Sequence, residues 1–109
     1  MTVNELIREL PLTPITVPDG SREVEGVYIG DLLSWVMGRA QADNAWITIM
    51  SNLNIVAVAT LADVSCIILA EGVTLDEQVI TTAAAKDVNI LSSDKTAYEV
   101  ASALAGMGL

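Results

Sequence analysis

The hydrophobic positions of this 109-residue chain are densest between residues 45 and 72, and this stretch is predicted to form the centre of the fold. It begins with the run AWITIM and ends with the run SCIILA, and uncharged Ile-rich runs of this kind are typical of strands buried on both faces. Between them, Ser51 and Asn52 are good helix N-cap residues, and about three turns of apolar helix follow. A linker of this length suits a crossover between parallel strands, so we predict a right-handed βαβ unit. The residues expected to face the sheet from the crossover helix are Val56 or Val58, Ala59 and Ala62.

Four further helices and three short strands are predicted around this unit. Residues 2–5 and 74–77 match the capping-box pattern, while Gly30-Asp31 and Ser92-Ser93-Asp94 are expected to begin the other two helices. Strands are expected at residues 15–17, 22–29 and 89–91. The alternation of strands and helices predicts an α/β fold. We expect a single small domain over residues 1–109, with a central, mostly parallel sheet, βαβ units and helices on its faces.

The helix predicted from Asp31 to Arg39 is apolar on more than one side. A single sheet covers only one stripe of a helix, so we expect Leu32, Trp35 and Met37 to form a patch outside the core. Exposed patches of this kind mark interaction sites, and a twofold dimer is the commonest way to bury one. We therefore predict a homodimer with these three residues in its interface. The alternative is that the N-terminal helix covers the patch through Leu6, Ile7 and Leu10.

The charge balance narrows the classes of partner. The net charge is −9, there is no histidine and the five basic residues are scattered, so neither nucleic acid nor an anionic membrane surface is an expected partner. Residues 44–62 are uncharged, but Ser51, Asn52 and Asn54 lie in the middle of this stretch, where hydrocarbon would leave them without hydrogen bonds. A membrane span is therefore not expected. Because no signal peptide is recognisable, we predict a cytoplasmic protein.

Catalytic and metal-binding motifs are absent from the sequence. It contains neither a GxxxxGKS/T phosphate loop nor a GxGxxG fingerprint. The lack of histidine excludes a Ser-His-Asp triad, an HExxH site and any histidine-ligated metal. Cys66 is the single cysteine and lies in an apolar run, so we interpret it as a small buried hydrophobe. We predict that the chain is not an enzyme and uses no cofactor or metal.

A candidate ligand site follows from the predicted sheet. Ligands of open α/β sheets bind outside the carboxyl ends of the strands, where helix N-termini offer free N–H groups to anions. The loops expected at this edge are 51–54, 70–74 and 92–94. Their polar or small residues, which form our candidate ligand set, are Ser51, Asn52, Asn54, Gly72, Thr74, Ser92 and Ser93. The alternative is that these residues only cap helices. Glu71 and Asp94 in the same loops oppose a phosphate group.

Three segments also carry a family resemblance. YIGDLLSWVMGRA (28–40), the stretch 45–72 and LSSDKTAYEVASAL (91–104) resemble the small stand-alone DRTGG-type proteins of anaerobic bacteria, which are similar to the N-terminal domain of HPr kinase/phosphorylase. The resemblance covers about residues 22–104. The Asp-Arg pair that gives the family its name falls at Ser51-Asn52, and its Thr-Gly-Gly falls at residues 70–72. Of these five positions only Gly72 matches.

The resemblance implies an α/β fold and a domain that assembles or regulates rather than catalyses. We therefore predict a regulatory or assembly module that acts through protein–protein interaction, with an unidentified protein partner besides the second copy of the homodimer. The alternative is a sensor of a small ligand, a nucleotide or another anion, that uses the three loops at the carboxyl ends of the strands.

Overall fold

The computed structural model describes residues 1–109 and contains one five-stranded sheet with the order β1-β5-β4-β3-β2. Strands β2 to β5 are parallel to their neighbours, and β1 pairs with β5 in the antiparallel direction. The elements in chain order are α1 (Val3–Glu9), β1 (Thr13–Thr16), β2 (Val27–Ile29), α2 (Leu33–Arg39), β3 (Ala45–Thr48), α3 (Asn54–Ala62), β4 (Cys66–Leu69), α4 (Glu77–Ala85), β5 (Ile90–Ser92) and α5 (Ala97–Gly106). The prediction of one small α/β domain with a mostly parallel sheet is confirmed for its fold class.

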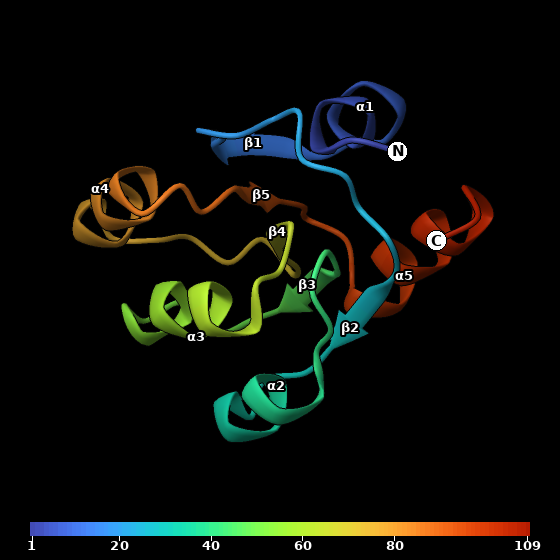
Figure 1. The fold of residues 1–109 in the computed structure, drawn as a ribbon. Helices are drawn as coiled ribbons and strands as arrows, with labels where there is room; N and C mark the ends of the chain where they lie inside the picture. The colour runs from blue at the N-terminus through green and yellow to red at the C-terminus, as the bar shows by residue number, and fades with distance from the viewer.

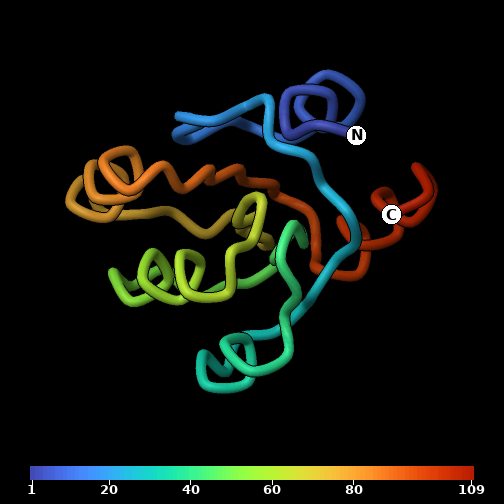
Figure 2. Tube along the Cα trace, viewed as in Figure 1, coloured from blue at the N-terminus to red at the C-terminus, as the bar shows by residue number.

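The sheet separates two helical layers, as Figure 1 shows. Helices α2, α3 and α4 lie on one face, and α1 and α5 lie on the other (Figures 1 and 2). Alternate residues of a strand point to opposite faces, so Trp46 and Ile67 pack with α2, α3 and α4, whereas Ile47 and Ile68 pack with α1 and α5. Both central strands are therefore buried on both faces, which explains their uninterrupted apolar sequences.

The predicted central βαβ unit is present as β3, α3 and β4, with β3 and β4 parallel from the Ala45–Cys66 pair onward. Val56, Val58 and Ala59 of α3 are buried, as expected. Ala62 is only partly buried, because it lies in the last turn of the helix, just before the chain turns away.

The structure corrects the predicted start of α2. This helix begins at Leu33 rather than at Asp31, and no side chain caps it. The Asp31 carboxylate instead accepts hydrogen bonds from the Thr48 hydroxyl at 2.7 Å and from the Ile49 N–H at 2.9 Å. Asp31 therefore joins the ends of β2 and β3.

The other helix starts differ in a similar way. Asn52 accepts a hydrogen bond from the Asn54 N–H at 3.0 Å, but the N-cap position of α3 is Leu53. Thr74 does not begin a helix, because α4 starts three residues later, at Glu77. A capping box of Thr96 and Glu99 begins α5 in place of the predicted residues 92–94. Ser92 and Asp94 are thus not used as helix caps.

The strand predicted at residues 22–29 is shortened to Val27–Ile29. Gly26 interrupts the segment with a φ of +107°, and a side chain there would lie 3.0 Å from the Asn44 amide nitrogen. A backbone conformation that favours glycine therefore ends the strand at its amino side.

Helix α1 does not cover the apolar patch on α2. Its buried residues Val3 and Leu6 pack in the cluster on the opposite face of the sheet, beside α5. The alternative in which Leu6, Ile7 and Leu10 cover Trp35 within one chain is therefore wrong.

Candidate functional site

The carboxyl edge of the sheet opens between β4 and β5. The chain leaves β4 toward α4 on one face and leaves β5 toward α5 on the other face. Every other pair of neighbouring parallel strands is followed by helices on a single face, because α2, α3 and α4 share one layer. Diverging connections of this kind open the crevice in which α/β domains bind their ligands.

Backbone hydrogen bonds hold the two diverging loops together at the base of this crevice. The Glu71 N–H donates to the Lys95 carbonyl at 2.8 Å, and the Gly72 N–H donates to the Ser93 carbonyl at 2.9 Å. The Ser93 N–H donates in turn to the Leu69 carbonyl at 2.8 Å. Glu71 and Gly72 both have positive φ angles, +62° and +70°, which turn the β4 loop sharply enough to make these bonds. The crevice is therefore bounded by hydrogen-bonded loop backbone.

A pocket of about 270 Å³ occupies this crevice. Its walls are mostly apolar, and its polar groups are two hydroxyls and one carboxylate. The lining residues are Ile15, Leu69, Gly72, Val73, Thr74, Leu75, Ile80, Ser92 and Asp94. No basic side chain lines it, so the pocket favours a ligand that donates hydrogen bonds over a bare phosphate group.

The structure brings together only part of the candidate ligand set. Gly72, Thr74 and Ser92 line the pocket. Ser93 is buried and does not line this pocket but a second hollow beside α5, and its hydroxyl accepts a hydrogen bond from the Lys95 N–H at 3.0 Å. Ser51, Asn52 and Asn54 are exposed and do not line this pocket, because the 51–54 loop leads to α3 and does not take part in the divergence.

Asp94 lines the pocket but is not part of the candidate ligand set that the sequence predicts. The sequence predicts Asp94 as part of a helix cap and as a group that repels phosphate. In the structure its side chain is directed at the β4 loop, since a Cβ on Gly72 would lie 3.3 Å from the Asp94 Oδ1. The sequence signal that marks this position is the polar run after a buried strand. A polar run of this kind predicts a loop, but it does not predict which other loop the Asp94 side chain faces.

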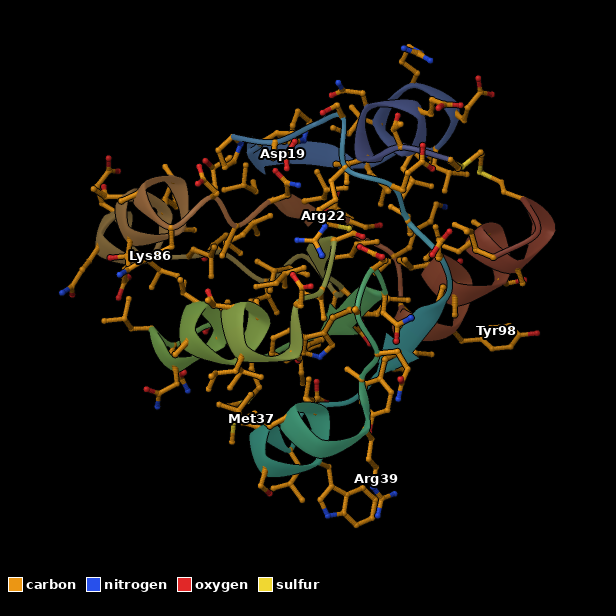
Figure 3. All side chains as sticks on the ribbon, viewed as in Figure 1. Asp19, Arg22, Met37, Arg39, Lys86 and Tyr98 are labelled. Carbon is orange, nitrogen blue, oxygen red and sulfur yellow. The ribbon has the colours of Figure 1, made fainter.

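A larger hollow of about 390 Å³ lies elsewhere, between the end of α1 and the outer side of α5. Lys95 and Tyr98 are among its lining residues, but Tyr98 is 80% exposed and points away from the domain (Figure 3). The Glu99 carboxylate at its edge is already engaged in the capping box with Thr96. The pocket between β4 and β5 is therefore the better candidate site.

Cys66 is not available for catalysis. Its side chain is fully buried within β4, and burial raises the pKa of its thiol from 9.0 to about 12. The interpretation as a buried hydrophobe is thus confirmed. The structure also contains no group of three or more metal-ligating Cys, Asp or Glu residues. None of its helices is long and apolar enough to span a membrane.

We expect native Cys66 to resist alkylation by iodoacetamide at pH 8. Its thiolate population should lie about a thousandfold below that of an exposed cysteine, because the thiol ionises near pH 12 rather than 9.0. Mass spectrometry of native and guanidinium-unfolded protein measures the labelling. Equal rates in the two states would show that the thiol is accessible. The raised pKa of Cys66 also makes the free energy of unfolding depend on pH. Its contribution to stability is fully present below pH 9.0 and is lost as the pH rises from 9.0 toward 12, because the thiol ionises more easily in the unfolded chain.

The fold and the pocket define a layered α/β domain whose sheet opens at its carboxyl edge. The chain belongs to the DRTGG domain family, whose family model matches residues 15–107. A search of curated proteins returns no match to the chain.

The solved structures that share the fold include a regulatory region of a pyrophosphatase. That structure contains the CBS and DRTGG domains of the regulatory region of Clostridium perfringens pyrophosphatase, in complex with the activator diadenosine tetraphosphate. The two chains are 16% identical, with a TM-score of 0.70. The match covers 93% of this chain and 44% of that one, so the present chain spans less than half of its structural neighbour.

Proposed function

We propose that this chain is a regulatory domain that acts without catalysis and binds a nucleotide through its nucleoside end in the pocket between β4 and β5. The observation that carries the proposal is the divergence of the β4 and β5 loops, which gathers Thr74, Ser92 and Asp94 around an apolar cavity. Family membership and a fold neighbour whose regulatory region takes a dinucleotide activator support the regulatory part.

The size and charge of the pocket indicate which part of a nucleotide it holds. A volume of about 270 Å³ is below the ~300–1,000 Å³ of sites that enclose whole ligands, so the pocket accepts one ring system rather than a whole dinucleotide. A carboxylate accepts hydrogen bonds from ribose hydroxyls or an exocyclic amine, and apolar walls suit a base. The phosphates would remain in solvent, away from Asp94.

The proposal is consistent with the resemblance to the N-terminal domain of HPr kinase/phosphorylase, which implies regulation rather than phosphoryl transfer. That resemblance and a cytoplasmic location remain predictions. Sensing a ligand is favoured over assembly alone because a formed pocket lies at the edge of the sheet where α/β domains bind ligands.

We expect calorimetry to detect binding of adenosine and of diadenosine tetraphosphate, and no binding of pyrophosphate. Asp94→Asn should weaken the binding of both ligands by about tenfold or more, because a hydrogen bond to a charged group contributes about 1.5–3 kcal/mol. Asp87→Asn is the matched control, since Asp87 is exposed before β5 and lies outside the pocket. Its affinities should equal those of the wild type.

Three outcomes would contradict the proposal. If calorimetry detects no heat of binding with any nucleoside at millimolar concentration, the pocket does not bind nucleosides. Equal affinities for wild type and Asp94→Asn would place the ligand elsewhere. Binding of pyrophosphate alone would show an anion site rather than a nucleoside pocket.

A further inference from the structure

Two cavities flank the loop that joins β5 to α5. Ser92 and Asp94 line the pocket between β4 and β5, whereas Ser93 and Lys95 line the hollow of about 390 Å³ on the other side of this loop. We call this second cavity the α1–α5 hollow, because it lies between the end of α1 and α5, which share one face of the sheet (Figure 1). Its volume falls in the range of about 300–1,000 Å³ that is typical of small-molecule sites.

Apolar side chains form a large part of the α1–α5 hollow. Leu12 and Val100 line it and are buried members of the core cluster that packs α1 and α5 on the sheet. Leu10, Pro11 and Ala103 complete the apolar part of the lining. Because the core holds Leu12 and Val100 in place, this surface is formed in the absence of a ligand, and it suits a compact hydrocarbon group.

A buried serine also lines the hollow. Ser93 is 6% exposed, and its N–H donates to the Leu69 carbonyl at 2.8 Å, which extends the pairing of β5 with β4 by one residue. Alternate residues of a strand point to opposite faces, so Ser93 shares the α1 and α5 face with Leu91. The Ser93 hydroxyl oxygen accepts from the Lys95 N–H at 3.0 Å, which leaves the hydroxyl proton for an acceptor in the hollow.

The charged groups of the hollow are one lysine and one glutamate. Lys95 forms no ion pair within the chain, and its backbone is held on both sides, by the Ser93 hydroxyl and by the Glu71 N–H, which donates to the Lys95 carbonyl at 2.8 Å. Glu99 is already engaged, because its Oε1 accepts from the N–H and the hydroxyl of Thr96, each at 3.1 Å. The groups that remain for a ligand are therefore an ammonium group and a hydroxyl donor.

We propose that the α1–α5 hollow binds a small carboxylic acid in its anionic form. The apolar body of the ligand packs on Leu12 and Val100, and its carboxylate accepts hydrogen bonds from the Ser93 hydroxyl and the Lys95 ammonium group. A single basic side chain matches the single charge of a carboxylate, whereas a chain with a net charge of −9 would repel a phosphate dianion more strongly. The proposal does not depend on the nucleotide pocket, because none of these four residues lines it.

Heteronuclear NMR titration of the whole isotope-labelled chain with isocaproate, in the absence of nucleotide, tests the proposal. We expect the amide signals of Leu12, Ser93, Lys95 and Ala103 to shift, with a dissociation constant in the millimolar range because the Lys95 side chain is exposed. Lys95→Met should weaken the binding about threefold, as expected for the loss of an exposed ion pair. Isocaproamide, which has the same shape but no charge, should bind the wild type more weakly by a similar factor.

Lys86→Met is the matched control, because Lys86 is an exposed lysine at the end of α4, in the other helical layer, and does not line the hollow. Both variants lower the net charge equally, so Lys86→Met should bind isocaproate as tightly as the wild type does. The proposal would be overturned if no signal shifts at millimolar isocaproate, if only signals of the nucleotide pocket shift, or if both lysine variants have the same affinity. Equal affinities for the acid and its amide would also overturn it. Because no nucleotide is present, none of these results bears on the binding of a nucleoside by Asp94.

Discussion

Replacement of Asn89 by leucine is expected to destabilise the domain by about 2–5 kcal/mol, since a buried polar group left without a partner costs about 1–3 kcal/mol and each part-buried hydrogen bond that is lost adds about 0.5–1.5 kcal/mol. Asn89 is 1% exposed and lies directly before β5. Its side-chain oxygen accepts from the Asp19 N–H at 3.0 Å, and its amide nitrogen donates to the carbonyls of Asp19 at 2.8 Å and Ser65 at 2.9 Å. Leucine has a similar volume but restores none of these bonds.

The loss is large for a domain of this size. Stability of about 0.05–0.15 kcal/mol per residue gives a total of roughly 5–16 kcal/mol for 109 residues, so this variant would lose a substantial fraction. Urea denaturation followed by circular dichroism measures the change. Asn54→Leu is the control, because Asn54 is exposed, and we expect a change within about 0.5 kcal/mol there. Equal midpoints for wild type and Asn89→Leu would show that water replaces the lost bonds.

The hydrogen bonds of Asn89 cannot be predicted from the sequence. Asn89 precedes an apolar run, and asparagine at such a position suits a turn or the start of a strand. Its partners are separated from it by 70 residues and by 24 residues, so the contact depends on the completed sheet. The sequence therefore does not predict the structural role of Asn89, because that role depends on residues that are brought next to it only by folding.

The central strands were predictable because their environment is uniform. β3 and β4 are buried along their whole length on both faces, so every position carries the same apolar signal. The helix starts were harder, because each loop offers several residues able to cap a helix. Backbone geometry selected among them. The positive φ of Gly72 and the hydrogen bond from its N–H to the Ser93 carbonyl, for example, commit the 92–94 loop to the crevice and leave Thr96 to cap α5.

The candidate site could be predicted only in part, because several loops fit the same rule. The rule that ligands bind at the carboxyl ends of strands selects these loops, but three loops satisfy it equally. The choice between them depends on the face to which α5 crosses. Val100 and Leu104 give α5 an apolar stripe that would suit either face of the sheet, so its sequence does not make that choice.

The packing of α3 on the sheet leads to the second large effect. Ala59 is 3% exposed and packs in the same cluster as Trp46 and Ile67. We expect Ala59→Leu to destabilise the domain by about 1–3 kcal/mol, because extra methylene groups in a well-packed core force off-rotamer side chains and backbone shifts. The helix has little freedom to move outward, since the carbonyl of Ala59 accepts from the N–H groups of Asp63 and Val64, which lead directly into β4.

Urea denaturation of Ala59→Leu and of Ala84→Leu separates overpacking from a general effect of leucine on a helix. Ala84 is an exposed position on α4, and leucine is nearly as good a helix former as alanine, so that variant should change stability by less than about 0.5 kcal/mol. The slope of the unfolding free energy with urea should be the same in all three proteins, because a similar surface is exposed on unfolding. If Ala59→Leu unfolds at the wild-type midpoint, α3 does not pack closely on the sheet, and the arrangement of β3, α3 and β4 described above would be wrong.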